Sequence, residues 1–105
     1  MRYLHDLGYD AFLDGWSVLV HPERRFIVSS HIDTVRPYVP FSFNGEYAYG
    51  RGVCDAKASV AAILLALERL DRPRFGVALL HDEEEGGTGS RSFCQRYRPE
   101  RAVVM

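Results

Sequence analysis

The stretch VALLHDEEEGGTGS, residues 77–90, joins an apolar run to four consecutive acids and three glycines. Residues 77–80 predict a buried strand, and the acids follow directly at its end. Four adjacent carboxylates repel one another and raise each other's pKa unless a positive charge is present. Ligands of α/β proteins bind at the carboxyl ends of strands, and a divalent cation would neutralise this cluster. The glycines then allow a tight turn. We therefore predict that this stretch forms half of a metal-dependent active site.

The composition excludes several classes of protein. The 105 residues suffice for one domain, and an apolar content of 47% suffices for a core. A formal net charge of −1 gives no electrostatic reason to expect nucleic acid or an anionic membrane as a partner. No apolar run has the length of a membrane span, and the first residues do not resemble a signal peptide. Cys54 and Cys94 lack metal-site spacing and are too few for a disulfide framework, so we expect a cytoplasmic protein.

Hydrophobic periodicity predicts alternating strands and helices. The expected elements are a helix up to residue 7, a hairpin of strands 9–13 and 16–20, a strand over 25–30, an irregular segment with a short hairpin over 36–50, a helix over 58–70, a strand over 74–80, a helix over 90–97 and a strand over 101–105. This succession indicates a layered α/β fold with a mainly parallel sheet. The first helix is short and the last strand stops at the chain end, so we expect a domain truncated at both ends.

Two further polar clusters lie at predicted element ends, and each has a simple structural explanation. His31 and Asp33 follow a strand and could be a stabilising hydrogen-bonded pair. Asp55 precedes a helix and could serve as its N-terminal cap or as a favourable charge at the helix N-terminus. The acids of residues 82–85 could likewise be a solvated loop. Taken singly, none of the three clusters requires a functional site.

Taken together, the clusters predict a metal centre. The loops after neighbouring parallel strands converge, so His31, Asp55, Glu83 and Glu84 can meet in one pocket. Imidazole and carboxylate ligands suit zinc or a similar divalent ion. Carboxylates beyond the needs of one ion suggest two ions that share a bridging carboxylate. A remaining acid can then act as a general base.

Three motifs carry a resemblance to a known family: SHIDTV at residues 30–35, YGRGVCDAK at 49–57 and DEEEGG at 82–87. In order and spacing they resemble the co-catalytic zinc metallohydrolase family of aminoacylase, carboxypeptidase G, acetylornithine deacetylase and succinyl-diaminopimelate desuccinylase. The resemblance covers nearly the whole chain. It implies a three-layer α/β/α zinc-peptidase-like catalytic domain that uses two divalent metal ions, either zinc or cobalt.

The resemblance also implies roles for particular residues. The metal ligands would be His31, Asp55 and Glu84, with Asp55 bridging both ions through a segment that contains a cis Asp55–Ala56 peptide bond. The catalytic residues would be Glu83 and Asp33. Glu83 would be the general base for a metal-bound water, and Asp33 would orient the His31 imidazole.

Several residues near these positions are assigned no ligand role. We expect His81 to be a strand-end residue beside the site and Glu85 to be a surface acid. Cys54 is not needed as a ligand by the family pattern. Arg51 and Lys57 are expected to pair with nearby carboxylates or with the helix start.

Family enzymes are several-fold longer than this chain. They supply a further carboxylate ligand after a strand like 101–105, a histidine near the C-terminus, and a lid domain that mediates homodimerisation. We therefore expect residues 1–105 to be a partial catalytic domain without the lid, which by itself is incomplete and inactive.

The expected function is hydrolysis of the amide bond of an N-acyl amino acid or small peptide, by analogy an amino-acid biosynthetic deacylation of the acetylornithine, succinyl or carrier-linked lysine type. The alternative is a non-catalytic or incomplete fragment that binds metal weakly. An aspartyl-type or phosphoryl-transfer enzyme that uses the acidic run with magnesium is disfavoured by His31, because magnesium prefers oxygen ligands.

Overall fold

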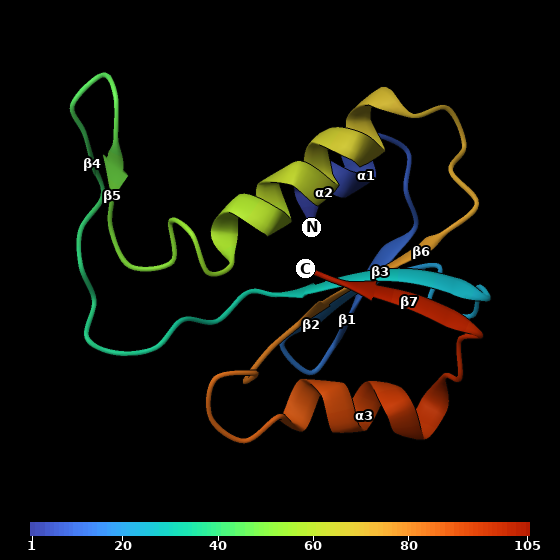
Figure 1. The fold of residues 1–105 in the computed structure, drawn as a ribbon. Coiled ribbons are helices and arrows are strands. Elements are labelled where there is room, and N and C mark those ends of the chain that lie inside the picture. The colour runs from blue at the N-terminus through green and yellow to red at the C-terminus, as the bar shows by residue number, and fades with distance from the viewer.

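The computed structural model describes the whole chain, residues 1–105. In chain order its elements are α1 (Arg2–Asp6), β1 (Ala11–Asp14), β2 (Ser17–Val20), β3 (Phe26–His31), β4 (Ser42–Phe43), β5 (Ala48–Tyr49), α2 (Lys57–Arg69), β6 (Gly76–Leu80), α3 (Thr88–Arg96) and β7 (Arg101–Val104) (Figure 1). Every predicted helix and strand is present. The boundaries differ from the predicted ones by one or two residues, because periodicity locates an element better than its ends.

The sheet is mixed, with a parallel half that carries the predicted functional loops. Its five strands lie in the order β1-β2-β6-β3-β7. The β1–β2 hairpin pairs antiparallel with β6, whereas β6, β3 and β7 are mutually parallel. The fold is thus α/β, and the first hairpin makes its sheet mixed.

Strand side chains alternate between two apolar clusters on opposite faces of the sheet. On one face Val20, Val77 and Leu79 pack with residues of α2, among them Ile63 and Leu67. On the other face the neighbouring positions Leu19, Ile27 and Ala78 pack with Phe93 of α3. A strand buried on both faces has no polar alternation, which explains the continuous apolar run at the end of β6.

The helices are divided between the two faces. Figure 1 shows α1 and α2 on one side of the sheet and α3 on the other. Gly89 lets α3 approach closely, because a Cβ at that position would lie 2.6 Å from the backbone oxygen of His81. The close approach packs the start of α3 against the backbone of His81, where the acidic loop after β6 begins.

The N-terminal segment shows why β1 begins two residues later than predicted. Gly8 ends α1 with a positive φ of 91°, and the Tyr9 amide bonds back to the Leu4 carbonyl oxygen. The Tyr9 hydroxyl donates to the carbonyl oxygen of Leu67 at 2.6 Å. Tyr9 therefore belongs to the connection that fastens α1 to α2.

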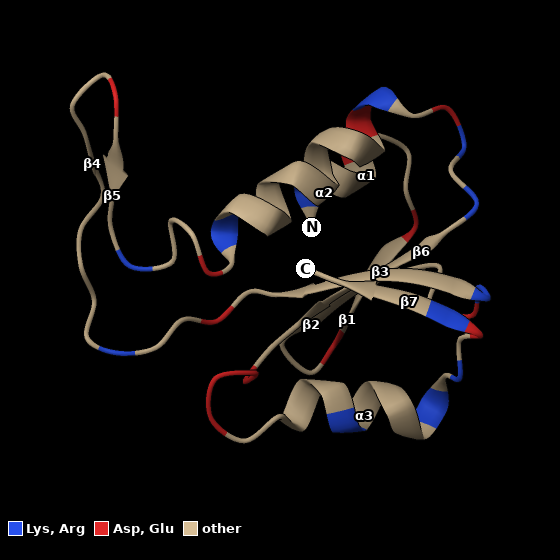
Figure 2. Ribbon diagram, viewed as in Figure 1, with Lys and Arg blue, Asp and Glu red and all other residues tan.

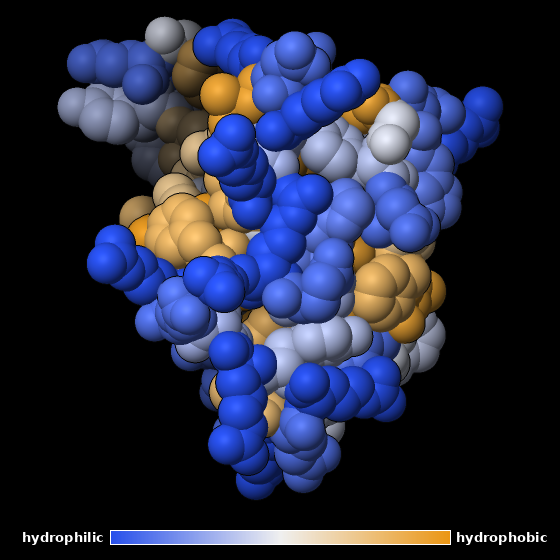
Figure 3. Space-filling view, turned by 90° about the vertical axis from the view of Figure 1, so that its right-hand side faces the viewer, coloured by the Kyte–Doolittle hydropathy of each residue, from blue (hydrophilic) through white to orange (hydrophobic).

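The β4–β5 hairpin exposes aromatic side chains, whereas the opposite side of the molecule is mostly hydrophilic. The two-stranded hairpin of β4 and β5 projects away from the body, with Phe41, Phe43 and Tyr47 exposed (Figure 1). The side of the molecule away from this hairpin presents mostly hydrophilic residues with scattered apolar patches (Figure 3). None of the helices combines the length and apolar character that crossing a membrane requires.

The packing of α2 predicts unequal effects of two leucine substitutions. Leu67 is 2% exposed in the cluster beneath α2, so Leu67→Ala should lower the free energy of unfolding by about 2–5 kcal/mol. Leu65 lies on the same helix and is 47% exposed, so Leu65→Ala should change it by less than about 0.5 kcal/mol. Urea unfolding measures both values. Equal losses in the two variants would contradict the observed orientation of the helix.

Candidate metal centre

The predicted site residues converge at one edge of the sheet. His31 is the last residue of β3 and pairs in register with Leu80, the last residue of β6. Because the two strands are parallel and adjacent, the loops that follow them leave the sheet side by side. Figure 2 shows three acidic segments close together there: after β3, before α2, and between β6 and α3. The expected convergence of the three motifs is therefore observed.

The His31 imidazole lies at the centre of this acidic group. Its side chain is 10% exposed, and its Nε2 atom lies 2.9 Å from Asp55 Oδ1. The same nitrogen is 3.5 Å from Glu83 Oε2 and 3.8 Å from Glu84 Oε1. One nitrogen thus faces three carboxylates that come from two different loops.

Asp33 joins the loop after β3 to the loop after β6. Its Oδ1 atom accepts the backbone N–H of Glu83 and its Oδ2 atom accepts that of Glu84, both at 3.0 Å. His31 Nδ1 donates to the backbone oxygen of Asp33 at 2.9 Å and lies 3.4 Å from its carboxylate. The Asp33 backbone carbonyl therefore orients the imidazole more directly than the carboxylate does. The carboxylate mainly positions Glu83 and Glu84.

The local charges shift three pKa values. Burial alone lowers the pKa of His31, but the hydrogen bond with Asp55 and the other nearby acceptors and carboxylates outweigh burial and raise it. Burial alone raises the pKa of Asp33, but the N–H groups of Glu84 and Glu83 outweigh burial and lower it. Loss of hydration, followed by the charges of Asp55 and Glu83, raises the pKa of Glu84. The cluster therefore has an excess of negative charge.

The donor set fits a divalent cation. One ligand atom each from His31, Asp55 and Glu84 lies within 4.8 Å of the other two, and these are the three residues predicted as metal ligands. No lysine or arginine nitrogen lies within 4 Å of the carboxylates of Asp55, Glu83 or Glu84. Nδ1 donates its N–H to the Asp33 carbonyl oxygen, so once the Nε2 proton is lost the Nε2 lone pair is directed at these carboxylates. One imidazole nitrogen and oxygen ligands are a set that zinc and similar ions accept.

Asp55 does not cap α2. The residue at the N-cap position is Ala56, and no side chain forms a capping hydrogen bond there. The Asp55 side chain is 73% exposed and points toward His31. The Asp55–Ala56 peptide bond is cis, as the family resemblance implied. The simple helix-cap interpretation of Asp55 is therefore wrong.

His81, Cys54 and Glu85 are not among the three residues whose ligand atoms meet in the cluster. His81 Nδ1 lies 2.7 Å from Ser17 Oγ on β2, and Ser17 Oγ also accepts the His81 backbone N–H. Glu85 is exposed. Arg51 forms no ion pair with a carboxylate, and its Nε donates to the Pro37 carbonyl oxygen at 2.9 Å.

Asp82 has a role in the loop that the sequence did not reveal. It has a positive φ of 59°, and its carboxylate accepts the Thr88 hydroxyl at 2.6 Å and the Gly86 N–H at 3.4 Å. Aspartate tolerates this conformation and commonly bonds to nearby backbone groups, so the acid followed by glycines was the available signal. Asp82 thus stabilises the loop through bonds to residues of the same segment, whereas Asp33 stabilises it from the loop after β3.

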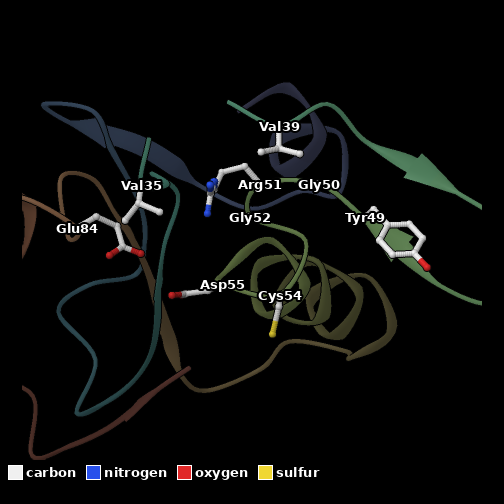
Figure 4. Close-up of a pocket in the computed structure, with 9 residues that line it drawn as sticks. All are labelled: Val35, Val39, Tyr49, Gly50, Arg51, Gly52, Cys54, Asp55 and Glu84. Carbon is white, nitrogen blue, oxygen red and sulfur yellow. The ribbon is translucent and has the colours of Figure 1, made fainter. Parts of the chain in front are cut away.

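Two cavities flank the cluster and share Asp55 and Glu84 as wall residues. The larger has a volume of about 500 Å³ and extends toward the segment that carries β4 and β5 (Figure 4). The smaller has a volume of about 330 Å³ and extends past His31 toward Ser90 and Met105. A ligand in either cavity would touch the carboxylates of the cluster.

Comparison with known proteins gives consistent matches. A family model described as peptidase family M20/M25/M40 matches residues 27–105. A probable carboxypeptidase of Aspergillus terreus is 39% identical over 110 residues, which cover 88% of this chain and 25% of that protein. A probable carboxypeptidase of Aspergillus flavus is 44% identical over 82 residues, which cover 64% of this chain and 20% of that protein.

A peptidase M20 domain-containing protein of Schizosaccharomyces pombe is 48% identical over 46 residues, which cover 44% of this chain and 12% of that protein. The chain therefore spans at most a quarter of the length of these relatives. The matches confirm the family resemblance drawn from the three motifs. Because the family model covers most of the chain, the chain belongs to peptidase family M20/M25/M40.

Proposed function

We propose that this chain forms part of a metal-dependent hydrolase that cleaves the amide bond of an N-acyl amino acid or small peptide. The observation that carries the proposal is the meeting of His31, Asp55 and Glu84 around one point, with the Glu83 carboxylate beside them. Membership of a peptidase family and similarity to probable carboxypeptidases support the same reaction class.

The cluster would hold two divalent ions, zinc or cobalt. His31 and Glu84 would each ligate one ion, and Asp55 would bridge the two because its exposed carboxylate can offer an oxygen to each. When bound, such ions lower the pKa of a water molecule and polarise a carbonyl group. His31 can serve only with Nε2 deprotonated, and its Nδ1–H bond to the Asp33 carbonyl supports that tautomer.

Glu83 is suited to moving a proton. Its backbone is held by Asp33, whereas its side chain forms no hydrogen bond and reaches within 3.5 Å of His31 Nε2. A carboxylate in this position can take a proton from the attacking water and give it to the leaving amine nitrogen. The fixed backbone and free side chain let Glu83 act at both points of the reaction.

The substrate class follows by analogy. Similarity to probable carboxypeptidases favours peptides, and the related deacylases favour acetylornithine, N-succinyl or carrier-linked lysine substrates of amino-acid biosynthesis in the cytoplasm. We further propose that residues 1–105 form the first part of a three-layer α/β/α catalytic domain. Helices on both faces of the sheet support this assignment, with the remaining ligands and a dimerising lid domain contributed by segments outside residues 1–105.

The role of Glu83 predicts a variant that binds metal but does not turn over substrate. Glu83→Gln keeps the size of the side chain and the backbone bond to Asp33 but removes the base. We expect kcat for N-acyl amino acids and short peptides to fall by about 10²–10⁴-fold, which is the usual contribution of a general base. Metal content, measured by elemental analysis, should be unchanged. Turnover close to that of the unmodified enzyme would exclude Glu83 as the base.

The matched control is Glu85→Gln, which removes the neighbouring acid that lies outside the metal cluster and is exposed. This variant should retain both metal content and kcat. If the unmodified intact gene product binds zinc and cobalt yet hydrolyses no N-acyl amino acid or peptide, the non-catalytic alternative gains support instead.

The position of Asp33 predicts a loss of metal affinity. In Asp33→Asn, one side-chain oxygen would be replaced by an NH₂ group that cannot accept a backbone N–H, so Glu84 or Glu83 would be released. We expect zinc affinity, measured by calorimetric titration, to fall by about 10–100-fold, as for other residues that orient metal ligands. Asp71→Asn, at an exposed site remote from the cluster, should leave the affinity unchanged. Equal affinity of the Asp33 variant and the unmodified protein would rule out this positioning role.

A further inference from the structure

The larger cavity beside the metal cluster has a mixed chemical character. Two carboxylates of the cluster form part of its wall, and a single cationic side chain, Arg51, forms another part. The rest of the lining is apolar side chains and glycine backbone: Val35, Val39, Tyr49, Gly50, Gly52 and Cys54. Its volume of about 500 Å³ is within the range of cavities that bind small molecules.

Arg51 is fixed in place and still has unused donors. Its Nε donates to the Pro37 carbonyl oxygen, which orients the guanidinium plane. The ion pairs of this structure that involve arginine are those of Arg2, Arg25 and Arg96, so Arg51 pairs with no carboxylate. Figure 4 shows its guanidinium reaching into the space that Val35, Asp55 and Glu84 border. The terminal N–H groups of Arg51 are therefore available to a ligand in this cavity.

We propose that Arg51 binds the free carboxylate of the amino-acid part of the substrate, with the scissile amide directed at the metal cluster. This inference rests on the proposed function and specifies which end of the substrate enters the cavity. A guanidinium offers two parallel N–H donors that match a carboxylate, and its prior orientation by Pro37 reduces the entropy lost on binding. Val35, Val39 and Tyr49 offer apolar surface to the hydrocarbon part of the same amino acid.

The charge distribution favours this orientation. Arg51 is the only cationic side chain in the lining, so it is the one protein group there that attracts a carboxylate, whereas Asp55 and Glu84 are acids that offer a carboxylate no favourable contact. A substrate with a neutral amide at one end and a carboxylate at the other is therefore oriented before reaction. A residue that bound only Pro37 would not discriminate between charged and neutral ligands.

The test compares acid and amide ligands in the intact gene product. Arg51→Met removes the guanidinium, and Arg51→Lys keeps the charge but not the paired donors. The substrates are an N-acetyl amino acid or dipeptide with a free carboxylate and its C-terminal amide. For Arg51→Met we expect KM for the acid to rise by about tenfold or more, with kcat changed less and with the amide affected by less than about twofold. Arg51→Lys should lie between Arg51→Met and the unmodified protein.

A direct binding measurement separates this proposal from the proposed function. Calorimetry of the free amino acid and its amide, with and without added zinc, should show preference for the acid in the unmodified protein and loss of that preference in Arg51→Met. Arg36→Met, an exposed arginine in the same segment that does not line the cavity, is the control and should keep the preference.

Each outcome decides between the two proposals. Preference for the acid without any hydrolysis would support the role of Arg51 and contradict the proposed function. Equal losses of kcat/KM for acid and amide in Arg51→Met would show that Arg51 only supports the loop at Pro37, and would overturn the proposal. Failure of the unmodified protein to bind either ligand would also overturn it.

Discussion

The candidate metal centre depends on the two hydrogen bonds that the Asp33 carboxylate accepts from the backbone N–H groups of Glu83 and Glu84. Repulsion among adjacent acids would otherwise drive the loop after β6 toward solvent. The bonds neutralise part of the Asp33 charge and lower its pKa, so the carboxylate remains ionised at the centre of an acidic cluster. Through them, the loop after β3 determines where the loop after β6 presents its side chains.

This constraint acts because the sheet places the two loops together. β3 and β6 are parallel neighbours, and the ladder continues beyond β3 through the Ile32 N–H, which bonds to the Leu80 carbonyl oxygen. The buried faces of β6 fix its register against β2 and β3, because a shift of one residue would exchange the side chains of the two apolar clusters. Core packing therefore determines where β3 and β6 end, and so where the loops that carry the site residues begin.

Local sequence patterns predicted a helix, strand or site residue correctly wherever the pattern is compatible with only one local structure. The apolar run of β6, the helical spacing of α2 and the three motifs predicted the elements and the residues that now lie together. Contacts between distant segments could not be predicted in the same way. The bond between Ser17 and His81 joins residues 64 apart, and the position of the first hairpin next to β6 depends on packing against both faces. That hairpin is the reason the sheet is mixed. The carbonyl of Asp33, rather than its carboxylate, bonds to His31 because of loop geometry that the residue type does not encode.

The same distinction explains why Arg51 was misassigned from its position next to glycines and acids. A guanidinium near carboxylates is expected to pair with them, and the pairing would have reduced the negative charge of the cluster. The structure instead holds Arg51 at Pro37 and leaves a cavity between the arginine and the acids. The positive charge of Arg51 and the negative charges of Asp55 and Glu84 therefore lie on different parts of the wall of one cavity, whose volume suits a small ligand. Metal ions on the acidic side would leave the cation on the other side free to attract an anion, so the separation gives the cavity a direction. A lining without unpaired charges would not favour one orientation of a charged ligand over another.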